Sequence, residues 1–390
     1  MIAKRLEYFD SSLIRQAFDR ADDIPGAIDL SIGFPEDDTP DYIKAAAIGA
    51  IQSGFTRYTP SNGILELRAA LAEKLCRENN MEMVPGQITV TPGLTTAIAL
   101  AYLALLDPGD EVLLPDPFFP PYRDLALLVG AKIVFIDTYP SFQLTAKQIE
   151  PMITPKSKVL IINSPNNPSG AVYPERELRK IAKLAKKHNL VVISDEIYEY
   201  FAYGTGHFSI GSIYPQTLTF NGFSKAYAMT GWRVGYIAGP TDIIDAINRL
   251  QQYVVFSTSS VSQKAALAAL LKNPKKLTMK YRGKRDVALK YLDPSFEVRG
   301  AEGAFFGFLR LPAGVSDLEF TKEAARHGVI LLPSRVFSQR TDYVRLSYAT
   351  SHQLLVRGLK RTKLTLTKLL HEKEMETGPP RKSQNKKQLT

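Results

Sequence analysis

Short apolar runs alternate with amphipathic helical patterns through the middle of the chain, and this alternation constrains the fold more than any other feature. The runs are rich in β-branched residues and too short for helices, which is typical of strands buried on both faces. In order they read QITVT, EVLLP, KIVFI, KVLIIN, LVVISDE, TLTF and VGYIAG, and helical patterns such as ERELRKIAKLAKKHN lie between several of them. Strands that alternate with helices predict an α/β domain with a mostly parallel central sheet flanked by helices.

Two segments lack this alternation and indicate a smaller α+β domain built from both chain ends. We expect an N-terminal arm with part of the small domain at 1–44, a large domain at 45–261, and the rest of the small domain at 262–371. The small domain should contain the strands GAFFGFLRLP and YVRLSYA. Residues 372–390 are polar, contain Pro-Pro and show no apolar periodicity, so we expect a disordered basic tail.

Composition limits the partners and the compartment. Of the formal net charge of +10, the last ten residues contribute four lysines and arginines without any acid. We therefore expect no nucleic-acid partner, although a nucleic-acid-binding tail is the alternative. The chain has no apolar run long enough to span a membrane, and its first residues lack a targeting pattern. Cys76 is the only cysteine, which excludes a disulfide, argues against a metal site and favours the reducing cytoplasm.

Polar and aromatic residues follow the predicted strands at the sheet edge where α/β proteins bind ligands. Thr95 opens a helix after the first strand, where free backbone N–H groups bind anions, although threonine there also serves as a simple cap. The aromatic loop DPFFPPY and the turn SPNNPSG follow two further strands and serve either packing and turn formation or a ligand. Asp195 and Glu196 end the strand LVVIS, with Tyr198 nearby. A buried carboxylate such as Asp195 needs a partner, either a helix N-terminus or a protonated ring nitrogen.

Two cations lie close together in the otherwise apolar stretch NGFSKAYAMTGWRVGY. Such residues often extend their charged ends to solvent. A lysine held in apolar surroundings, in contrast, has a lowered pKa and becomes an amine that forms a Schiff base with a carbonyl. Arg233 stays charged and suits a permanent anion such as a phosphate. A carbonyl and a phosphate on one small molecule describe pyridoxal 5'-phosphate (PLP).

The motifs SPNNPSG, SDEIYE, NGFSKAYAMTGWRVGY and VRLSYA, in this order and spacing, closely resemble the class I/II aminotransferases of PLP fold type I. The resemblance covers about residues 10–365. It implies transfer of an amino group from an L-amino acid to a 2-oxo acid, with 2-oxoglutarate as the expected acceptor. A PLP-dependent β-lyase that cleaves C–S bonds is the alternative on the same fold. A regulatory or binding protein that retains the fold is an alternative of another class, and a dinucleotide-binding dehydrogenase is disfavoured because G-x-G-x-x-G is absent after the first strand.

The same resemblance implies roles for individual residues. Lys225 would form the Schiff base and carry protons, while Asp195 would hold the pyridine nitrogen. Tyr198 and Asn167 would flank the phenolic oxygen of the ring. The remaining cofactor contacts would come from Gly93, Leu94, Thr95, Phe119, Ser224 and Arg233, and from Tyr58 of a neighbouring subunit. The substrate α-carboxylate would be held by Arg345 with Asn167 and the backbone of Gly33. The match of Tyr58 implies a homodimer.

Two departures from the family pattern bear on cofactor and substrate binding. Many relatives carry a serine three positions before the lysine, where this chain has Gly222, so we expect fewer phosphate contacts. Aspartate-specific relatives often carry a lysine at the position of Leu94. We therefore expect aromatic or neutral amino donors to be used at least as well as aspartate. The apolar pocket would be lined by Phe9, Phe18, Phe119 and Tyr122, and Arg15 is the residue that would serve a dicarboxylate instead.

Overall fold

The computed structural model describes residues 2–3, 5–6, 24–204, 206–274 and 276–377. Its largest sheet has the strand order β2-β8-β7-β6-β5-β3-β4. The strands are β2 (Ile88–Thr91), β3 (Glu111–Asp116), β4 (Lys132–Asp137), β5 (Ser157–Asn163), β6 (Val191–Asp195), β7 (Thr217–Gly222) and β8 (Gly235–Ala238). Each apolar run singled out in the sequence forms one of them. All neighbouring pairs from β7 to β4 are parallel, and β8 runs antiparallel to β2 and β7, so the predicted mostly parallel sheet is confirmed.

Helices cover both faces of this sheet, which explains why its strands are continuously apolar. The helices around it are α4 (Leu94–Leu105), α5 (Pro120–Leu128), α7 (Glu175–Lys187) and α8 (Thr241–Val254). Along β5, Val159 and Ile161 join the core formed with α4, α5 and α8. Leu160 and Ile162 face the other way and join the core formed with α7. The side chains along β5 point alternately to the two faces of the sheet, and all of them named here are buried.

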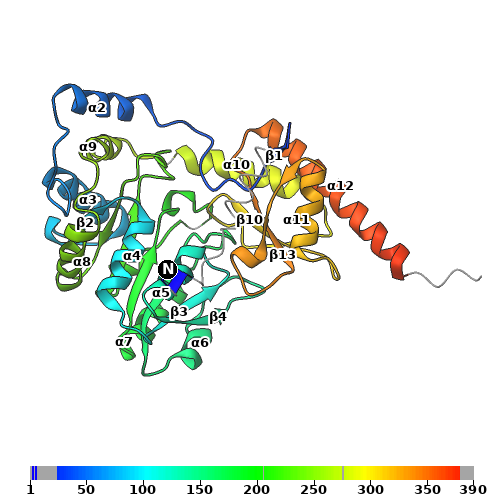
Figure 1. Ribbon diagram of the computed structural model, residues 1–390, viewed down its shortest axis with the longest axis horizontal. Helices are drawn as coiled ribbons and strands as arrows, with labels where there is room; N and C mark the ends of the chain where they lie inside the picture. Colours follow the sequence, from blue (N-terminus) through cyan, green and yellow to red (C-terminus); the bar gives the residue numbers. More distant parts are fainter. Residues whose placement is uncertain (1, 4, 7–23, 205, 275, 378–390) are drawn as a thin grey trace, which may run out of the picture.

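A second, antiparallel sheet with the order β12-β13-β10-β9 lies in the C-terminal part of the chain. Its strands are β9 (Glu297–Arg299), β10 (Phe306–Arg310), β12 (Leu332–Pro333) and β13 (Tyr343–Ser347). The helices α10 (Lys276–Tyr291), α11 (Asp317–Arg326) and α12 (His352–Thr377) lie on the same side of the molecule (Figure 1). The short strand β1 (Ile28–Asp29) pairs in parallel with β11 (Val329–Ile330), which brings this early segment of the chain to the C-terminal part.

Two helices, α9 and α12, do not follow the domain boundaries that the sequence predicted. The helix α9 (Ser260–Ala269) packs against α2 (Asp41–Gln52) and α3 (Leu65–Asn79), although the sequence assigned most of α9 to the small domain. Gln263 of α9 fixes this contact, because its Oε1 accepts a 2.7 Å hydrogen bond from the backbone of Ile64.

The helix α12 also continues to Thr377, beyond the expected start of a disordered tail at 372. Lys373 forms a 3.1 Å ion pair with Glu319 of α11, an interaction that composition does not reveal. Residues 378–390 lie outside the described part of the chain. Within the residues that are described, no helix is both long and apolar enough to cross a membrane.

Candidate active site

A cavity of about 290 Å³ lies at the edge of the large sheet where its parallel strands end. Nearly all of the residues predicted from the sequence line it. They are Gly33, Leu94, Thr95, Phe119, Asn167, Asp195, Tyr198, Ser224, Lys225, Arg233 and Arg345. The cavity is also lined by residues that sequence reasoning gave no role there, namely Phe34, Asn163, Ile197 and Thr230. Gly93 lies beside it, whereas Tyr58 does not line it.

Lys225 lies in the turn after β7, and its ammonium group donates a 2.7 Å hydrogen bond to the carbonyl oxygen of Gly33. Burial, together with the positive charges of Arg345 and Arg233, lowers the pKa of Lys225 to about 8, against the opposing charge of Asp195. A substantial fraction of this amine is therefore neutral near pH 7.5, as a nucleophile that attacks a carbonyl must be.

Asp195, the last residue of β6, is 3% exposed. Its Oδ2 accepts a 2.7 Å hydrogen bond from the hydroxyl of Tyr122, and its Oδ1 accepts one of 3.1 Å from the backbone N–H of Ile197. Burial raises the pKa of Asp195 to about 6 in spite of these two bonds. Sequence reasoning gave Tyr122 only an apolar role. The available signal was its place three residues after Phe119, in the first turn of the helix that follows β3.

Two asparagines connect Asp195 to the turn SPNNPSG, which lines another part of the cavity. Asn163 ends β5, and its side chain donates a 3.1 Å hydrogen bond to the carbonyl oxygen of Asp195. The Oδ1 of Asn163 accepts a 2.8 Å bond from the backbone N–H of Asn167. Both asparagines are buried. The turn SPNNPSG is therefore held rigidly, and it presents the amide of Asn167 to the cavity.

Arg345 of β13 reaches the cavity from the small sheet and is 3% exposed. Its Nη1 donates a 3.0 Å bond to Oδ1 of Asn167, and its Nη2 donates a 2.6 Å bond to the carbonyl oxygen of Ser31. The guanidinium packs between the rings of Phe306 and Phe337, at 4.4 and 4.6 Å from their centroids. Burial lowers the pKa of Arg345 to about 10, so it stays charged at neutral pH. Its buried Nε has no hydrogen-bond partner in the described structure, which fits a cation that awaits an anionic ligand.

The start of α4 and Arg233 form a further part of the cavity lining. Gly93 precedes α4 with a φ of 78°, a conformation that favours glycine, and a Cβ on it would lie 2.5 Å from Nη2 of Arg233. Thr95 and Ser224 line the same region. The free N–H groups of a helix start, two hydroxyls and a guanidinium are a suitable set of donors for a phosphate.

Two aromatic residues complete the lining. Tyr198 is buried, and burial raises its pKa above the usual range, so its phenol stays protonated and can donate a hydrogen bond. Its ring centroid lies 6.0 Å from Nζ of Lys225. Phe119 stands edge-on to Tyr122, with the ring centroids 5.7 Å apart. Aromatic rings therefore form part of the cavity lining.

Some predicted residues lie away from this cavity or outside the described chain. Tyr58 is 85% exposed, and its ring packs against Phe256 at 4.6 Å. Phe9, Arg15 and Phe18 lie outside the described residues. Tyr122 lines the cavity as expected but contributes its hydroxyl as well as its ring.

The charges of the cavity lining indicate what it binds. Lys225, Arg233 and Arg345 are basic, and Asp195 is the acidic residue among the described lining. Arg233 and Arg345 come from different elements, each beside further hydrogen-bond donors, and both lie close enough to the nucleophilic amine of Lys225 to lower its pKa. This arrangement accommodates a ligand with two anionic groups and a reactive carbonyl.

Comparisons with known proteins agree with this chemistry. The family model described as aminotransferase class I and II matches residues 25–361. The chain is 38% identical to aromatic-amino-acid aminotransferase 2 of Thermococcus litoralis, over 96% of this chain and 99% of that protein. It is 39% identical to a probable aspartate/prephenate aminotransferase of Aquifex aeolicus, over 88% of this chain and 91% of that protein.

The fold is also similar to solved structures. The aspartate aminotransferase from Thermus thermophilus with maleate superimposes with a TM-score of 0.91 at 35% identity, covering 94% of this chain and 100% of that one. The family match spans most of the chain, and the relatives are similar over nearly their whole length. The chain therefore belongs to the class I and II aminotransferases and is a PLP-dependent aminotransferase.

Proposed function

We propose that this aminotransferase binds PLP in the 290 Å³ cavity and uses Lys225 as its catalytic base. The observation that carries the proposal is the position of Lys225, which lines the same cavity as Asp195, Arg233 and Arg345 and whose amine has a pKa lowered to about 8. The donor set also fits the cofactor. The start of α4 and Arg233 are suited to bind the phosphate. Asp195 is suited to pair with the protonated ring nitrogen, and Phe119 is suited to stack on the face of the ring.

The cofactor supplies an electron sink for the α-carbon of a bound amino acid. Asp195, held by Tyr122 and Ile197, presents a carboxylate that keeps a proton at the ring nitrogen. Lys225 alternates between its neutral and charged forms near neutral pH, so it can take a proton from the α-carbon and return it to another atom within reach. Tyr198 and Asn167 would donate hydrogen bonds to the ring oxygen of the bound cofactor.

We assign Arg345 to the α-carboxylate of the substrate. Its paired Nη atoms are suited to a bidentate contact, and its position between Phe306 and Phe337 fixes its direction. The amide of Asn167 and the backbone of Gly33 lie beside it. Binding at this point would orient the α-carbon toward Lys225.

The donor preference is proposed from the remaining charges. With Arg345 and Arg233 assigned to the two anionic groups above, the described lining offers no further arginine and no lysine besides Lys225 for a side-chain carboxylate. The family resemblance places Leu94 at the position where aspartate-specific relatives often carry a lysine. Because a buried carboxylate without a partner is costly, we propose aromatic or other neutral amino acids as donors used at least as well as aspartate, with 2-oxoglutarate as the acceptor.

A panel of donors tests this preference. The kcat/KM values for aspartate, phenylalanine, tyrosine, alanine and methionine would be measured with 2-oxoglutarate under one set of conditions. We expect at least one neutral donor to equal aspartate. An advantage of aspartate above about a hundredfold, or about 2.7 kcal/mol, would contradict the assignment. Pyruvate and ammonia in place of an amino-acid product would identify the C–S lyase.

We propose a homodimer in which Tyr58 contacts the phosphate in the neighbouring subunit. Its ring is exposed and away from the cavity of its own chain, which supports a contact with another chain. Sedimentation with parallel activity assays tests the proposal, since dilution to monomers should release PLP, and a fully active monomer would refute it. The division into two domains around the two sheets and a cytoplasmic location remain proposals that rest on the sequence. Neither a membrane nor a nucleic-acid partner is proposed.

A further inference from the structure

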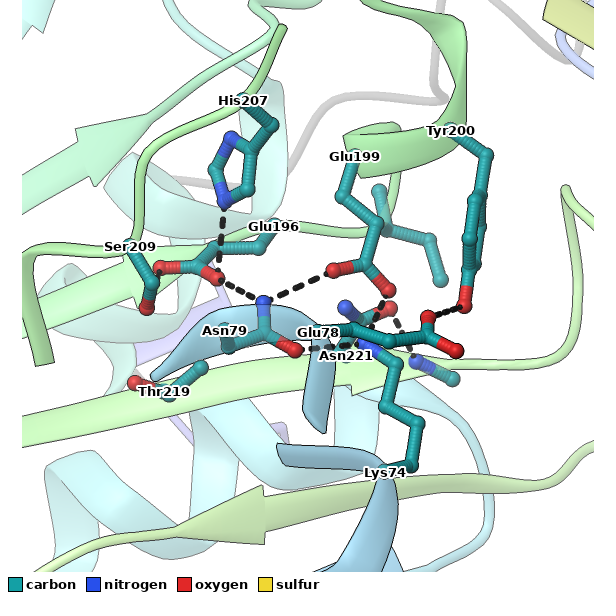
Figure 2. A network of polar contacts seen from close by, with 12 residues as sticks. Lys74, Glu78, Asn79, Glu196, Glu199, Tyr200, His207, Ser209, Thr219 and Asn221 are labelled. Atoms are coloured by element: carbon teal, nitrogen blue, oxygen red, sulfur yellow. Dashed lines mark hydrogen bonds and ion pairs between the residues drawn. The ribbon is translucent and has the colours of Figure 1, made fainter. Parts of the chain in front are cut away.

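A buried polar network involves residues that follow Asp195 closely in the chain (Figure 2). Its centre is Glu196, which follows Asp195 in the chain and is 1% exposed. The Oε1 of Glu196 accepts hydrogen bonds from the hydroxyls of Ser194, at 2.9 Å, and Ser209, at 2.8 Å. Its Oε2 lies 2.9 Å from Nε2 of His207. The sequence predicted that Asp195 and Glu196 lie at one sheet edge. In the structure, the side chain of Glu196 points into this network and not into the cavity.

A second carboxylate, Glu199, belongs to the same network. Lys74 of α3 forms a buried ion pair with it. The amide of Asn79 donates a 2.9 Å bond to Oε2 of Glu199 and lies 3.5 Å from Oε2 of Glu196. Asn79 therefore bridges the two carboxylates and holds them at a fixed separation (Figure 2).

The composition of this cluster also resembles a metal site, because ligand atoms of Glu196, Glu199 and His207 lie within 4.8 Å of one another. The contacts favour another interpretation. The amide hydrogens of Asn79 point at both carboxylates, and the ammonium of Lys74 already balances the charge of Glu199. The protein's own donors therefore fill the place that a cation would take.

The charge balance of the network depends on His207. Among the ion pairs of the described network, Lys74 offsets Glu199, and the charge of Glu196 is offset when His207 is protonated. Burial opposes protonation, but the carboxylates of Glu196 and Glu199 outweigh it and raise the pKa of His207. The described charged groups near His207 are Glu196 after β6, Glu199 of the 3-10 turn Glu199–Phe201, and Lys74, Arg77 and Glu78 of α3.

The network and Asp195 are joined by one peptide unit at the end of β6. A charge on Glu196 makes a negative charge on Asp195 less favourable and a positive charge beside it more favourable. We propose that the buried pair of Glu196 and His207 is a positioning pair that sets how tightly the cavity beside Asp195 holds a positive charge. This inference rests on the proposed function, because the positive charge in question is that of the bound cofactor and its lysine.

Two substitutions with opposite effects on the charge test the inference. His207→Gln keeps a donor toward Glu196 but removes the positive charge, whereas Glu196→Gln removes the negative charge. The readout is the midpoint pH of the absorption change of the PLP-loaded protein. We expect His207→Gln to raise this midpoint by about 0.5–1 pH unit. We expect Glu196→Gln to lower it by a similar amount, because the charge of Glu199 still favours the proton on His207. Opposite shifts cannot arise from a general loosening of the site.

Ser209→Ala is the matched control, because it removes a neutral hydrogen bond from Glu196 and leaves the charges unchanged. We expect a shift less than half that of either charge variant. Midpoints that move in the same direction, or that stay within about 0.2 unit of the unmodified protein, would overturn the inference. A protein that takes up PLP but shows no opposite shifts would leave the proposed function intact. A protein without any cofactor band would refute the proposed function itself.

A measurement on the unmodified protein avoids any variant that fails to fold. The chain has five histidines, so the ring nitrogen signals of His207 can be assigned by replacing the other four one at a time and following them by NMR. We expect both ring nitrogens of His207 to carry protons at pH 7. A neutral ring at that pH would overturn the proposed charge balance.

Discussion

The hydroxyl of Tyr122 donates a 2.7 Å hydrogen bond to Oδ2 of Asp195, which links the first turn of α5 to the end of β6. Both residues are buried, so this bond does not compete with water. It stabilises the charged form of a carboxylate whose burial favours the neutral form. The aromatic residue that sequence reasoning gave to a substrate pocket is therefore also a support for the acid proposed to hold the cofactor ring.

Removing this hydroxyl should reduce stability in a pH-dependent way. In the cofactor-free protein, we expect Tyr122→Phe to lower the free energy of unfolding by about 1.5–3 kcal/mol at pH 7.5, because a charged acceptor loses its donor. The variant raises the pKa of Asp195, so the deficit is present above about pH 6 and fades as the pH falls and Asp195 is protonated.

Urea unfolding at pH 7.5 and pH 5 measures this difference. Tyr102→Phe is the control, since its buried hydroxyl donates to the carbonyl oxygen of Tyr122 at 3.0 Å and loses only a neutral bond. A deficit that is equal at both pH values, or no larger than that of the control, would contradict the role given to Tyr122.

Arg345→Lys should impair the enzyme through substrate binding. Lysine keeps the charge but loses the two parallel donors and the packing between Phe306 and Phe337. We expect kcat/KM to fall at least about a hundredfold, which corresponds to about 2.7 kcal/mol, while the absorption spectrum of the bound cofactor is retained. Steady-state kinetics with the best donor checks this expectation.

The control for that variant is Arg340→Lys. Arg340 also packs on an aromatic ring, at 4.1 Å from the centroid of Tyr139, but it forms an ion pair with Asp137 outside the cavity. We expect its kinetics to match the unmodified protein. Equal losses in both variants would mean that Arg345 acts through the fold and not through the substrate.

The amine of Lys225 should react with a small acylating reagent at an unusually low pH. In the cofactor-free protein, we expect its rate of modification to rise with pH and level off above about pH 8, because only the neutral amine reacts. Lys44 is an internal comparison, since hydrogen bonds to Asp38 and Asp41 raise its pKa. Mass spectrometry of the two peptides follows both rates. A profile of Lys225 that still climbs steeply above pH 10 would contradict its lowered pKa.

The parts of the site that the sequence predicted are those that follow from sheet geometry. Parallel strands bring their carboxyl ends to one edge, so Asn167 and Asp195 were expected together from two short runs of residues. The lysine after β7 was expected at the same edge. The meeting of Asn167 with Arg345 followed only from the family resemblance, because 178 positions separate the two residues in the chain.

Other features depend on side-chain directions and on partners that a pattern does not reveal. The hydroxyl of Tyr122 reaches Asp195 because of where α5 begins, and nothing in DPFFPPY specifies that point. The contact between Glu196 and His207 depends on the path of the chain between them, which the residue pattern does not specify. The helix α12 continues past residue 372 and forms an ion pair there between Lys373 and α11, whereas composition suggested a tail.

The structure also accounts for one departure from the family pattern. Gly222 of β7 pairs with Gly235 of β8, and a Cβ on Gly222 would lie 2.9 Å from the Cα of Gly235. A serine does not fit at this position without movement of the strands. We expect Gly222→Ser to lower the free energy of unfolding by about 1–3 kcal/mol, as measured by urea denaturation. Gly231→Ser, at a site with no atom within 4 Å of the added Cβ, should be close to neutral, and equal effects would contradict this reading.

The central claim is that Lys225 bonds covalently to the cofactor, and one measurement tests it directly. The PLP-loaded protein is reduced with borohydride, digested and analysed by mass spectrometry. We predict a single modified peptide that carries the reduced cofactor on Lys225 and that is missing from Lys225→Ala. A cofactor found on another lysine, or no covalent product from a protein that contains PLP, would contradict the account.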